Sequence, residues 1–384
     1  MTLTRRSMVA TVLALGVTFL ACDKKAETIK IGQAVALTGD NSVWGQPEKN
    51  ALEMEIAKIN AKGGVLGKQL QLIAYDTRGD ATEGVNVAKR LVGDGVCAII
   101  GPGQSGVAIA MSSVTEPARV AFLATTATNP KVTVDDKTNQ VRKSAFRMCF
   151  IDPFQGTVAA QFAAKDLKLK TAAVIYDVGS DYSAFLGKYF IAEFEKQGGK
   201  LVGNEAFRSG ELDFRAILGK IKGAKPEILF IPTQQKEASL IMKQAADLGM
   251  KPVFMGGDGW ASPDLVPLSG GAAEGSFFVN IASLEDPDIQ GFVKEYKAKY
   301  NADPVMPNPV MAIDALDAII DAIQKTNGTD PAKILAQLEL TKDLPALTGK
   351  LTIDPATHNP LNKPAIIQEV KGGQIIFRTK YVTQ

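Results

Sequence analysis

The feature that most restricts the fold of this chain is the regular alternation of β-rich apolar runs with amphipathic stretches from residue 29 onward. In a series of this kind, the helices connect parallel strands and cover both faces of the sheet that the strands form. The first series predicts strands at 29–37, 69–75, 96–100 and 121–125, with helices near 47–61, 81–92 and from about 106. We therefore expect a doubly wound parallel sheet in the first part of the chain.

The same rhythm restarts after residue 152, which predicts a second α/β lobe of the same kind. This second series has expected helices near 153–167, 182–197 and 236–248, strands at 171–176, 200–207, 227–231 and 252–255, and a further apolar stretch at 214–221. A chain of 384 residues is long enough for two such lobes. The fold class that we predict is two doubly wound lobes joined by a multi-strand hinge.

The last hundred residues decide how the lobes are connected. A strand at 276–280 is followed by helices near 287–299, 308–324 and 331–338 and then by a β-rich tail, in which Gly372 and Gly373 form a hairpin turn. The late helices need a sheet to cover. We therefore expect one lobe made of 28–150 with 277–348 and another made of 153–275 with 349–384, with crossings near 150–153, 275–280 and 348–355.

Charge and histidine content exclude several functions. The chain has 43 Lys and Arg residues against 41 Asp and Glu, and without Arg5 and Arg6 the two counts are equal. The sequence contains no stripe of basic residues of the kind that would indicate nucleic-acid binding. The single histidine, His358, lies in a Pro-flanked, turn-like stretch, which excludes catalysis by several imidazoles and argues against a His-based metal site. We expect no cofactor and no metal.

The N-terminus is typical of an export signal. Arg5 and Arg6 precede an apolar run that is too short to span a bilayer, and residues 1–21 therefore form a predicted signal peptide. The run ends at Ala21 before Cys22, an arrangement that resembles a lipobox, so we expect Cys22 to be lipidated. Asp23 resembles the signal that retains lipoproteins on the inner membrane. The alternative is ordinary cleavage that leaves Cys22 as a free thiol.

Two further cysteines, Cys97 and Cys149, lie within apolar runs that we expect to be buried strands. An exported protein permits a disulfide, but cysteines inside strands are more often small core residues. We expect both thiols to be unpaired.

Residues 101–106 fit the pattern GxGxxG, and the motif lies between a predicted strand and a predicted helix. The motif follows the third strand instead of the first, and no acidic residue for a ribose follows about 20 residues later, so dinucleotide binding is not expected. A nucleophile elbow also fails, because Val107 stands where its last glycine is needed. What remains is Ser105 at the start of a predicted helix. Such a serine either helps to bind an anion such as a carboxylate or only caps the helix.

A second polar turn, residues 125–130, follows the next predicted strand and is rich in hydroxyl groups. Both turns lie at the carboxyl ends of neighbouring strands, where open α/β sheets bind their ligands. In the second lobe, the stretches 177–182 and 256–263 also follow strands. Asp258 suits an ammonium group there, and Tyr182 or Trp44 offers an aromatic surface, although Asp258 also suits a purely structural turn.

Taken together, the motifs resemble the branched-chain amino-acid-binding family of ABC transporters, which has the type I periplasmic-binding fold. The match runs in order along nearly the whole mature chain through the motifs at 37–39, 59–64, 75–76, 95–101, 127–130, 152–156, 181–182, 213–214 and 257–260. Such proteins are not enzymes. The resemblance implies that the lobes close on an amino acid and deliver it to permease subunits of the transporter.

The resemblance also implies roles for individual residues. Ser105, Thr126, Ala127 and Thr128 would hold the carboxylate of the ligand, Tyr182 and Asp258 would hold its α-ammonium, and Trp44 and Gln234 would lie near the ligand. Gln234 occupies a position where leucine/isoleucine/valine-binding relatives have a tyrosine, so a more polar pocket is possible. Gln104 stands where some relatives have a cysteine, which supports free thiols.

Three classes of function therefore compete. A transport receptor in the periplasm, anchored to the inner membrane by its lipid, is the reading that the export signal and the resemblance favour. A ligand-sensing subunit of the same fold, or a binder of amides or of aromatic or organic acids, is the alternative. An enzyme on a doubly wound fold is disfavoured by the missing catalytic constellation.

Overall fold

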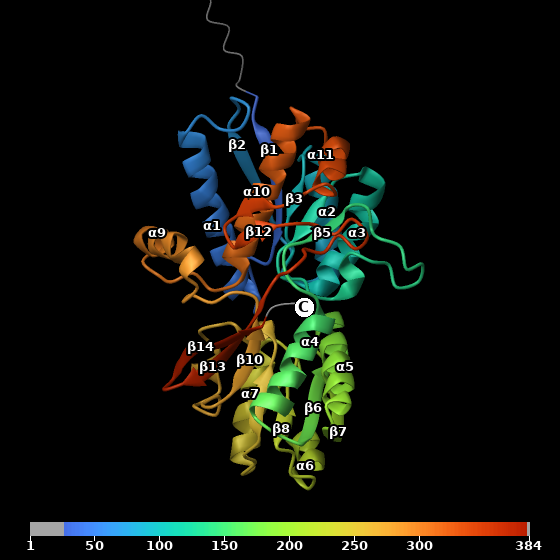
Figure 1. The fold of residues 1–384 in the computed structure, drawn as a ribbon, viewed down its shortest axis with the longest axis vertical. Coiled ribbons are helices and arrows are strands. Elements are labelled where there is room, and N and C mark those ends of the chain that lie inside the picture. Colours follow the sequence, from blue (N-terminus) through green and yellow to red (C-terminus); the bar gives the residue numbers. More distant parts are fainter. Residues whose placement is uncertain (1–26, 382–384) are drawn as a thin grey trace, which may run out of the picture.

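The computed structural model describes residues 27–381 and contains two main sheets, one above the other in Figure 1. The first is a parallel sheet of five strands in the order β2-β1-β3-β4-β5. Its strands are β1 (Ile29–Val35), β2 (Leu70–Asp76), β3 (Ile99–Ile100), β4 (Phe122–Ala124) and β5 (Ala145–Arg147). The predicted parallel sheet of the first series is therefore confirmed.

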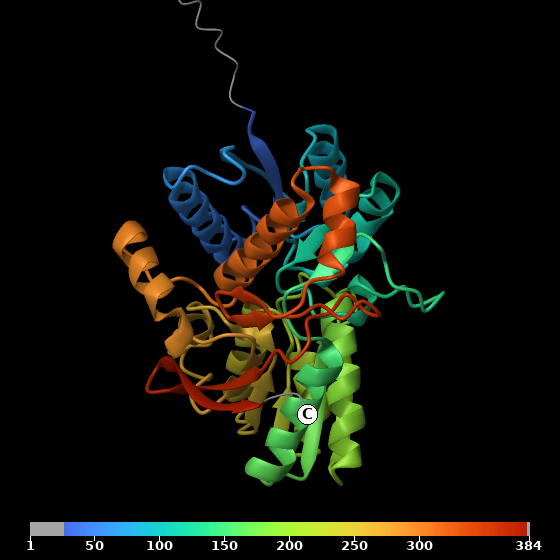
Figure 2. The same cartoon turned by 45° about the horizontal axis from the view of Figure 1, so that its top comes forward.

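Neighbouring residues of the central strands face opposite cores, which explains why β3 and β4 are continuously apolar. Ile100 and Leu123 pack in one core with α1 (Ser42–Ala61) and α10 (Asn308–Thr326), whereas Ile99 and Phe122 pack in another with α2 (Ala81–Gly93) and α3 (Ser105–Ala118). Figure 2 shows α10, in orange, beside the blue helix α1, with α11 (Pro331–Leu338) on the other side of α10. We refer to each sheet with its helices as a lobe.

The second sheet has the strand order β14-β13-β10-β9-β8-β6-β7. Five of its strands are parallel: β6 (Thr171–Asp177), β7 (Lys200–Phe207), β8 (Ile228–Phe230), β9 (Val253–Gly256) and β10 (Phe277–Asn280). The hairpin of β13 (Ala365–Lys371) and β14 (Gln374–Tyr381) adds two antiparallel strands, as the Gly372 and Gly373 turn predicts. Both glycines have positive φ, and their amides donate to the Glu274 carboxylate.

Helices cover both faces of this sheet as well. One core includes residues of α4 (Asp152–Gln161) and α5 (Asp181–Lys196), and the other includes residues of α6 (Arg215–Lys222) and α7 (Gln235–Asp247). The shorter helical segments are η1 (Pro130–Val132), η2 (Phe162–Asp166), η3 (Asp258–Trp260), α8 (Leu265–Leu268) and η4 (Pro287–Ile289). Helix α9 (Gln290–Tyr300) lies against α1, where Tyr300 donates to the carbonyl of Asn50. Within residues 27–381, no helix combines the length and apolarity that a membrane crossing requires.

Two of the expected lobe boundaries are wrong. Strand β10 was expected to begin the return to the first lobe at residue 277, yet it pairs with β9 and β13 in the second sheet. The tail was expected to join the second lobe at residue 349. Instead, β12 (Gly349–Leu351) pairs with β11 (Leu344–Ala346), and Thr348 between them donates its amide to Asp314 of α10.

The tail leaves the first lobe only after residue 360. The Arg147 amide donates to the carbonyl of His358, and the His358 ring stacks on Phe146 with their centroids 4.2 Å apart. His358 is fully buried, so its Pro-flanked stretch is a packed segment of the first lobe. The tail joins the second sheet at Ala365. Contacts between distant segments decided both corrections: strand pairing for β10, and hydrogen bonds and ring stacking for the tail. Local apolar patterns do not specify such partners.

Candidate ligand-binding site

A cavity of about 510 Å³ lies between the two lobes. Six of the eight sequence-predicted ligand residues line it: Trp44, Ser105, Thr126, Tyr182, Gln234 and Asp258. Ala127 and Thr128 are fully buried and are not among the lining residues. The structure therefore brings the polar turns of both lobes to one cavity and sets two of the predicted residues behind its wall.

The first-lobe wall is built from the turns that follow β3 and β4. Gly101 is required at the start of the first turn, because its φ is +89° and a Cβ there would lie 2.2 Å from the carbonyl oxygen of Ala34. Ser105 is the first residue of α3, and its hydroxyl oxygen accepts a hydrogen bond from the Asn129 amide at 3.2 Å. The Ser105 hydroxyl proton therefore remains available for a ligand oxygen.

The backbone of the second turn also offers donors. Among the hydrogen bonds of the described residues, none has the amide of Ala127 or Thr128 as its donor, whereas the carbonyls of Ala127, Thr128 and Asn129 all have partners. Buried backbone N–H groups are nearly always paired. Ser105 at a helix start makes the wall suited to a carboxylate, and the unpaired amides of Ala127 and Thr128 lie in the buried part of the turn that follows Thr126 of that wall.

The second-lobe wall carries a buried carboxyl group. Asp258 accepts a hydrogen bond from Gln155 at 2.8 Å, and the Tyr182 hydroxyl accepts one from the Gly259 amide at 3.2 Å. Burial raises the pKa of Asp258 to about 6, and hydrogen bonds from Gln155 and Tyr182 oppose that rise. An ammonium group is the partner that would stabilise the ionised Asp258 carboxylate.

The glycines around Asp258 have a packing role. A Cβ on Gly257 would lie 2.5 Å from the Tyr182 hydroxyl, and a Cβ on Gly259 would lie 2.9 Å from the Gln234 side-chain oxygen. Larger residues would push Tyr182 and Gln234 away from the cavity wall. The glycines therefore hold Tyr182, Gln234 and Asp258 together at the site.

Contacts between the lobes close the cavity on several sides. The Trp44 indole donates to the carbonyl of Ala261 at 2.7 Å. The Asn129 side chain donates to the carbonyl of Asp181 at 2.8 Å, and Lys236 pairs with Asp40 at 2.7 Å. Trp44, which was expected as a contact for the ligand, is thus also a link between the lobes.

The Trp44 link leads to a prediction about ligand release. Trp44→Phe keeps an aromatic ring but loses the N–H donor, so we expect ligand to dissociate about 2- to 10-fold faster, equivalent to roughly 0.5–1.5 kcal/mol for one hydrogen bond. Lys236→Met removes a partly exposed ion pair and is expected to change the dissociation rate less. Stopped-flow fluorescence measures both rates. Equal dissociation from Trp44→Phe and wild type would mean that the Trp44 link does not hold the closed form.

Two charged residues near the site, Glu48 and Arg147, were missed by sequence reasoning. Glu48 is buried beneath the first-lobe wall and accepts hydrogen bonds from Gln33, Thr125 and Asn308. Asn308 lines the cavity and also donates to Thr126 at 3.3 Å. The sequence did contain a sign of the role of Glu48. It lies four residues after Trp44 on the buried face of α1, where a charged residue is unusual.

Arg147 is the second residue that was missed. It lies at the end of β5 within a run taken as an apolar strand, is fully buried, and bonds the carbonyls of Ala127 and Asn129. The presence of a single arginine in that apolar run was the feature of the sequence that could have identified it. A charged residue in a buried strand requires specific partners.

The structure describes two of the three cysteines, and both are unpaired. Cys97 and Cys149 are free and buried, as expected, and burial raises the pKa of each thiol to about 12. Burial therefore favours the protonated form of both thiols at neutral pH, and a protonated thiol is a poor nucleophile. Cys22 lies outside the described residues.

Comparisons with known proteins agree with this architecture. Residues 28–374 match the family described as periplasmic binding protein. The chain is 32% identical over 327 residues to the Leu/Ile/Val-binding protein BraC3 of Rhizobium johnstonii, covering 84% of this chain and 87% of the relative. The leucine-binding protein LivK of Thermotoga maritima superposes with a TM-score of 0.84 at 32% identity, over 92% of this chain and 99% of LivK.

A second solved structure with a bound ligand is similar. The branched-chain amino-acid transporter substrate-binding protein LivJ of Streptococcus pneumoniae, determined in complex with isoleucine, has a TM-score of 0.84 at 28% identity. The similarity covers 93% of this chain and 99% of LivJ. The likeness therefore extends over both lobes.

Proposed function

The chain belongs to the periplasmic binding protein family, as a solute-binding protein of the branched-chain amino-acid ABC-transporter type, and we propose that it binds one L-α-amino acid between its lobes. In this proposal, the carboxylate contacts the Ser105 hydroxyl and the 126–128 turn, and the α-ammonium contacts Asp258 and Tyr182. The family consists of binding proteins, so the chain is not an enzyme.

The observation that carries the proposal is the opposite chemistry of the two cavity walls. The first-lobe wall offers the Ser105 hydroxyl at a helix start, with the unpaired amides of the turn after Thr126 buried next to it, and the second-lobe wall offers a buried carboxyl beside a tyrosine. An α-amino acid presents an anion and a cation on neighbouring atoms, so it satisfies both walls once the lobes have closed. An acid without an amine would leave Asp258 unpaired.

We further propose that the side chain of the ligand contacts Trp44 and Gln234. The Trp44 ring supplies apolar surface and the Gln234 amide supplies a polar edge, and both residues line the cavity. The name of BraC3 and the isoleucine bound to LivJ support a branched-chain ligand. Because the Gln234 side chain is polar and lines the cavity, polar amino acids belong in the ligand screen as well.

A thermal-unfolding screen tests the amino-acid proposal. Residues 22–384 with Cys22 replaced would be heated with each of the twenty L-amino acids and with amine-free organic and aromatic acids. A ligand at 100 times its dissociation constant is expected to stabilise the protein by about 2.7 kcal/mol. Stabilisation by amine-free acids alone would overturn the ligand class proposed here.

We propose that the protein delivers this ligand to ABC-transporter permease subunits from a lipid anchor at Cys22. The short apolar run before Ala21 and Cys22 supports the anchor. Mass spectrometry of protein from native membranes is expected to find Cys22 as a lipid-modified N-terminal residue. An unmodified N-terminus at another position would refute the anchor without affecting the ligand proposal.

We also propose that each lobe moves as a unit and that the lobe boundaries follow the sheets. The first lobe would then comprise 27–148 with 290–360, and the second 152–285 with 365–381. The chain passes between the sheets three times. Several parallel connections of this kind favour a hinge motion with a defined axis.

A further inference from the structure

Arg147 is a fully buried cation directly behind the turn that we assign to the ligand carboxylate. Its two terminal nitrogens donate to the carbonyl of Ala127 at 2.7 Å and to the carbonyl of Asn129 at 2.8 Å. Its Nε donates to the side-chain oxygen of Asn359 at 2.8 Å. The rigid guanidinium fork therefore fixes two peptide groups of one turn at the same time.

This fork also determines where the amides of the turn point. A peptide group is planar and trans, so its N–H and C=O lie on opposite sides. Because the Ala127 carbonyl points at Arg147, the Thr128 amide in the same peptide group points away from Arg147. Neither the Ala127 nor the Thr128 amide donates a hydrogen bond among the described residues. Arg147 thus holds the turn in a shape that leaves donors unpaired.

The charge of Arg147 has no ionised partner nearby. No ion pair of the residues 27–381 includes Arg147, and the oxygens around it belong to carbonyls, an amide and a hydroxyl. Asp152 is the carboxyl that acts on it, but burial raises the pKa of Asp152 to about 8 against the opposing effect of Arg147, which disfavours the ionised form of Asp152 at pH 7. A buried charge without a counter-charge destabilises the fold.

We propose that Arg147 is a positioning residue for the ligand carboxylate, which acts as the missing counter-charge for its guanidinium. The carboxylate would not touch Arg147. It would meet the donors of the 126–128 turn on the cavity side, while Arg147 holds the same turn from behind and gives it a positive potential. This role rests on the proposed function, and it predicts that Arg147 sets the preference for a carboxylate over a neutral carboxamide.

The test compares L-leucine with L-leucinamide by calorimetry at pH 7.5; if another amino acid stabilises wild type more strongly, it and its carboxamide are used instead. Wild type is expected to bind the amino acid at least about tenfold more tightly than the carboxamide. In Arg147→Met, this ratio is expected to fall about tenfold, with the carboxamide affinity changing less than about threefold.

A second variant tests the charge without removing the arginine. Asn359→Asp keeps an acceptor oxygen for the Arg147 Nε and places a carboxylate beside the guanidinium. The two hydrogen bonds from Arg147 to the carbonyls of Ala127 and Asn129 remain, but the new carboxylate at position 359 now supplies the counter-charge in place of the ligand. The preference for the amino acid over the carboxamide is expected to fall at least about threefold. This variant decides the question if Arg147→Met does not fold.

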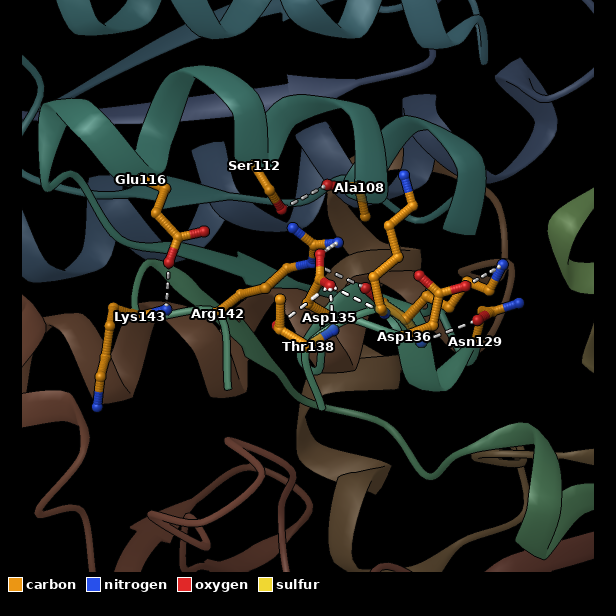
Figure 3. Close-up of polar contacts among 11 residues, drawn as sticks. Ala108, Ser112, Glu116, Asn129, Asp135, Asp136, Thr138, Arg142 and Lys143 are labelled. Atoms are coloured by element: carbon orange, nitrogen blue, oxygen red, sulfur yellow. Dashed lines mark hydrogen bonds and ion pairs between the residues drawn. The ribbon is translucent and has the colours of Figure 1, made fainter. Parts of the chain in front are cut away.

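A matched control is available in the adjacent loop. Arg142 also donates to a backbone carbonyl, that of Lys131, at 3.1 Å, but it forms an ion pair with Asp135 at 2.7 Å (Figure 3). Arg142→Met is expected to leave the ratio of the two affinities unchanged. This control separates a general loss of loop structure from a loss of the charge behind the carboxylate.

The outcomes separate the inference from the function on which it rests. If wild type binds no amino acid, or binds the amino acid and its carboxamide equally, the proposed carboxylate site is wrong and this role fails with it. If wild type discriminates but folded Arg147→Met, or Asn359→Asp, keeps the wild-type ratio, the proposed role of Arg147 is wrong while the ligand site stands.

Discussion

Asp258→Ala is expected to weaken amino-acid binding by about 2–5 kcal/mol, which corresponds to about 30-fold to several thousand-fold in dissociation constant. The reason is that the closed cavity excludes water from the α-ammonium, so the ammonium would be left without a counter-charge. Asp258 is 8% exposed, and its carboxylate is the proposed partner. Calorimetry with the amino acid found in the ligand screen measures this change.

The matched control is Asp264→Ala, which removes an exposed carboxylate from the same segment, outside the cavity lining. We expect it to bind like wild type. Ser105→Ala on the opposite wall is expected to cost less, about 0.5–3 kcal/mol, because backbone donors remain there. Wild-type affinity in folded Asp258→Ala would show that the amine site has been assigned wrongly.

The pH dependence of binding offers an independent check on Asp258. Its pKa is raised to about 6 by burial, so the group is about one-tenth ionised at pH 5 and about nine-tenths ionised at pH 7. If only the carboxylate binds the ammonium, affinity is expected to improve about tenfold from pH 5 to pH 7. Asp258→Asn should lack this change.

Between pH 5 and pH 8, ionisation of Glu48 is expected to lower the free energy of unfolding of wild type by about 3 kcal/mol. Glu48→Gln cannot ionise and is expected to lack this loss. Burial raises the pKa of Glu48 to about 7 from an ordinary value of 4.5, against the opposing hydrogen bonds from Asn308, Gln33 and Thr125. The folded chain therefore binds the Glu48 proton more tightly than the unfolded chain does. Protonation stabilises the fold below pH 4.5, and this contribution is lost as the pH rises through 7.

Urea unfolding of wild type and Glu48→Gln at pH 5 and pH 8 measures this difference. Wild type is expected to lose about 3 kcal/mol more than the variant on going to pH 8, and Glu53→Gln, on the exposed side of the same helix, is expected to behave like wild type. Parallel pH profiles for wild type and Glu48→Gln would show that Glu48 does not titrate in this range. Comparison with the variant is needed because burial also raises the pKa values of Asp152 and Asp317.

Local patterns in the sequence predicted much of the site. Polar turns at the carboxyl ends of strands located Ser105, Thr126, Tyr182 and Asp258, because parallel strands bring those ends to one edge of each sheet. The same reasoning could not separate Thr126, which lines the cavity, from Ala127 and Thr128, which lie behind its wall. Which residue of a turn faces a cavity depends on the orientation of single peptide groups.

The residues that support the site are known only from the folded chain. Arg147 and Asn359 are 212 positions apart, and Glu48 and Asn308 are 260 apart, yet each pair shares a hydrogen bond. A sequence shows an isolated charge in an apolar run but does not show its partner. The partner depends on how separate elements pack.

The sequence by itself determined that this protein has two parallel α/β lobes with polar turns at their facing ends. Alternating apolar runs specify strands and helices through local periodicity, and they also specify that both faces of each sheet are covered. Only the tertiary structure decided that β10 stays in the second sheet and that residues 349–360 remain with the first. The physical reason is that pairing and burial of these segments are set by contacts between residues far apart in the chain, and such contacts leave no local periodicity in the sequence.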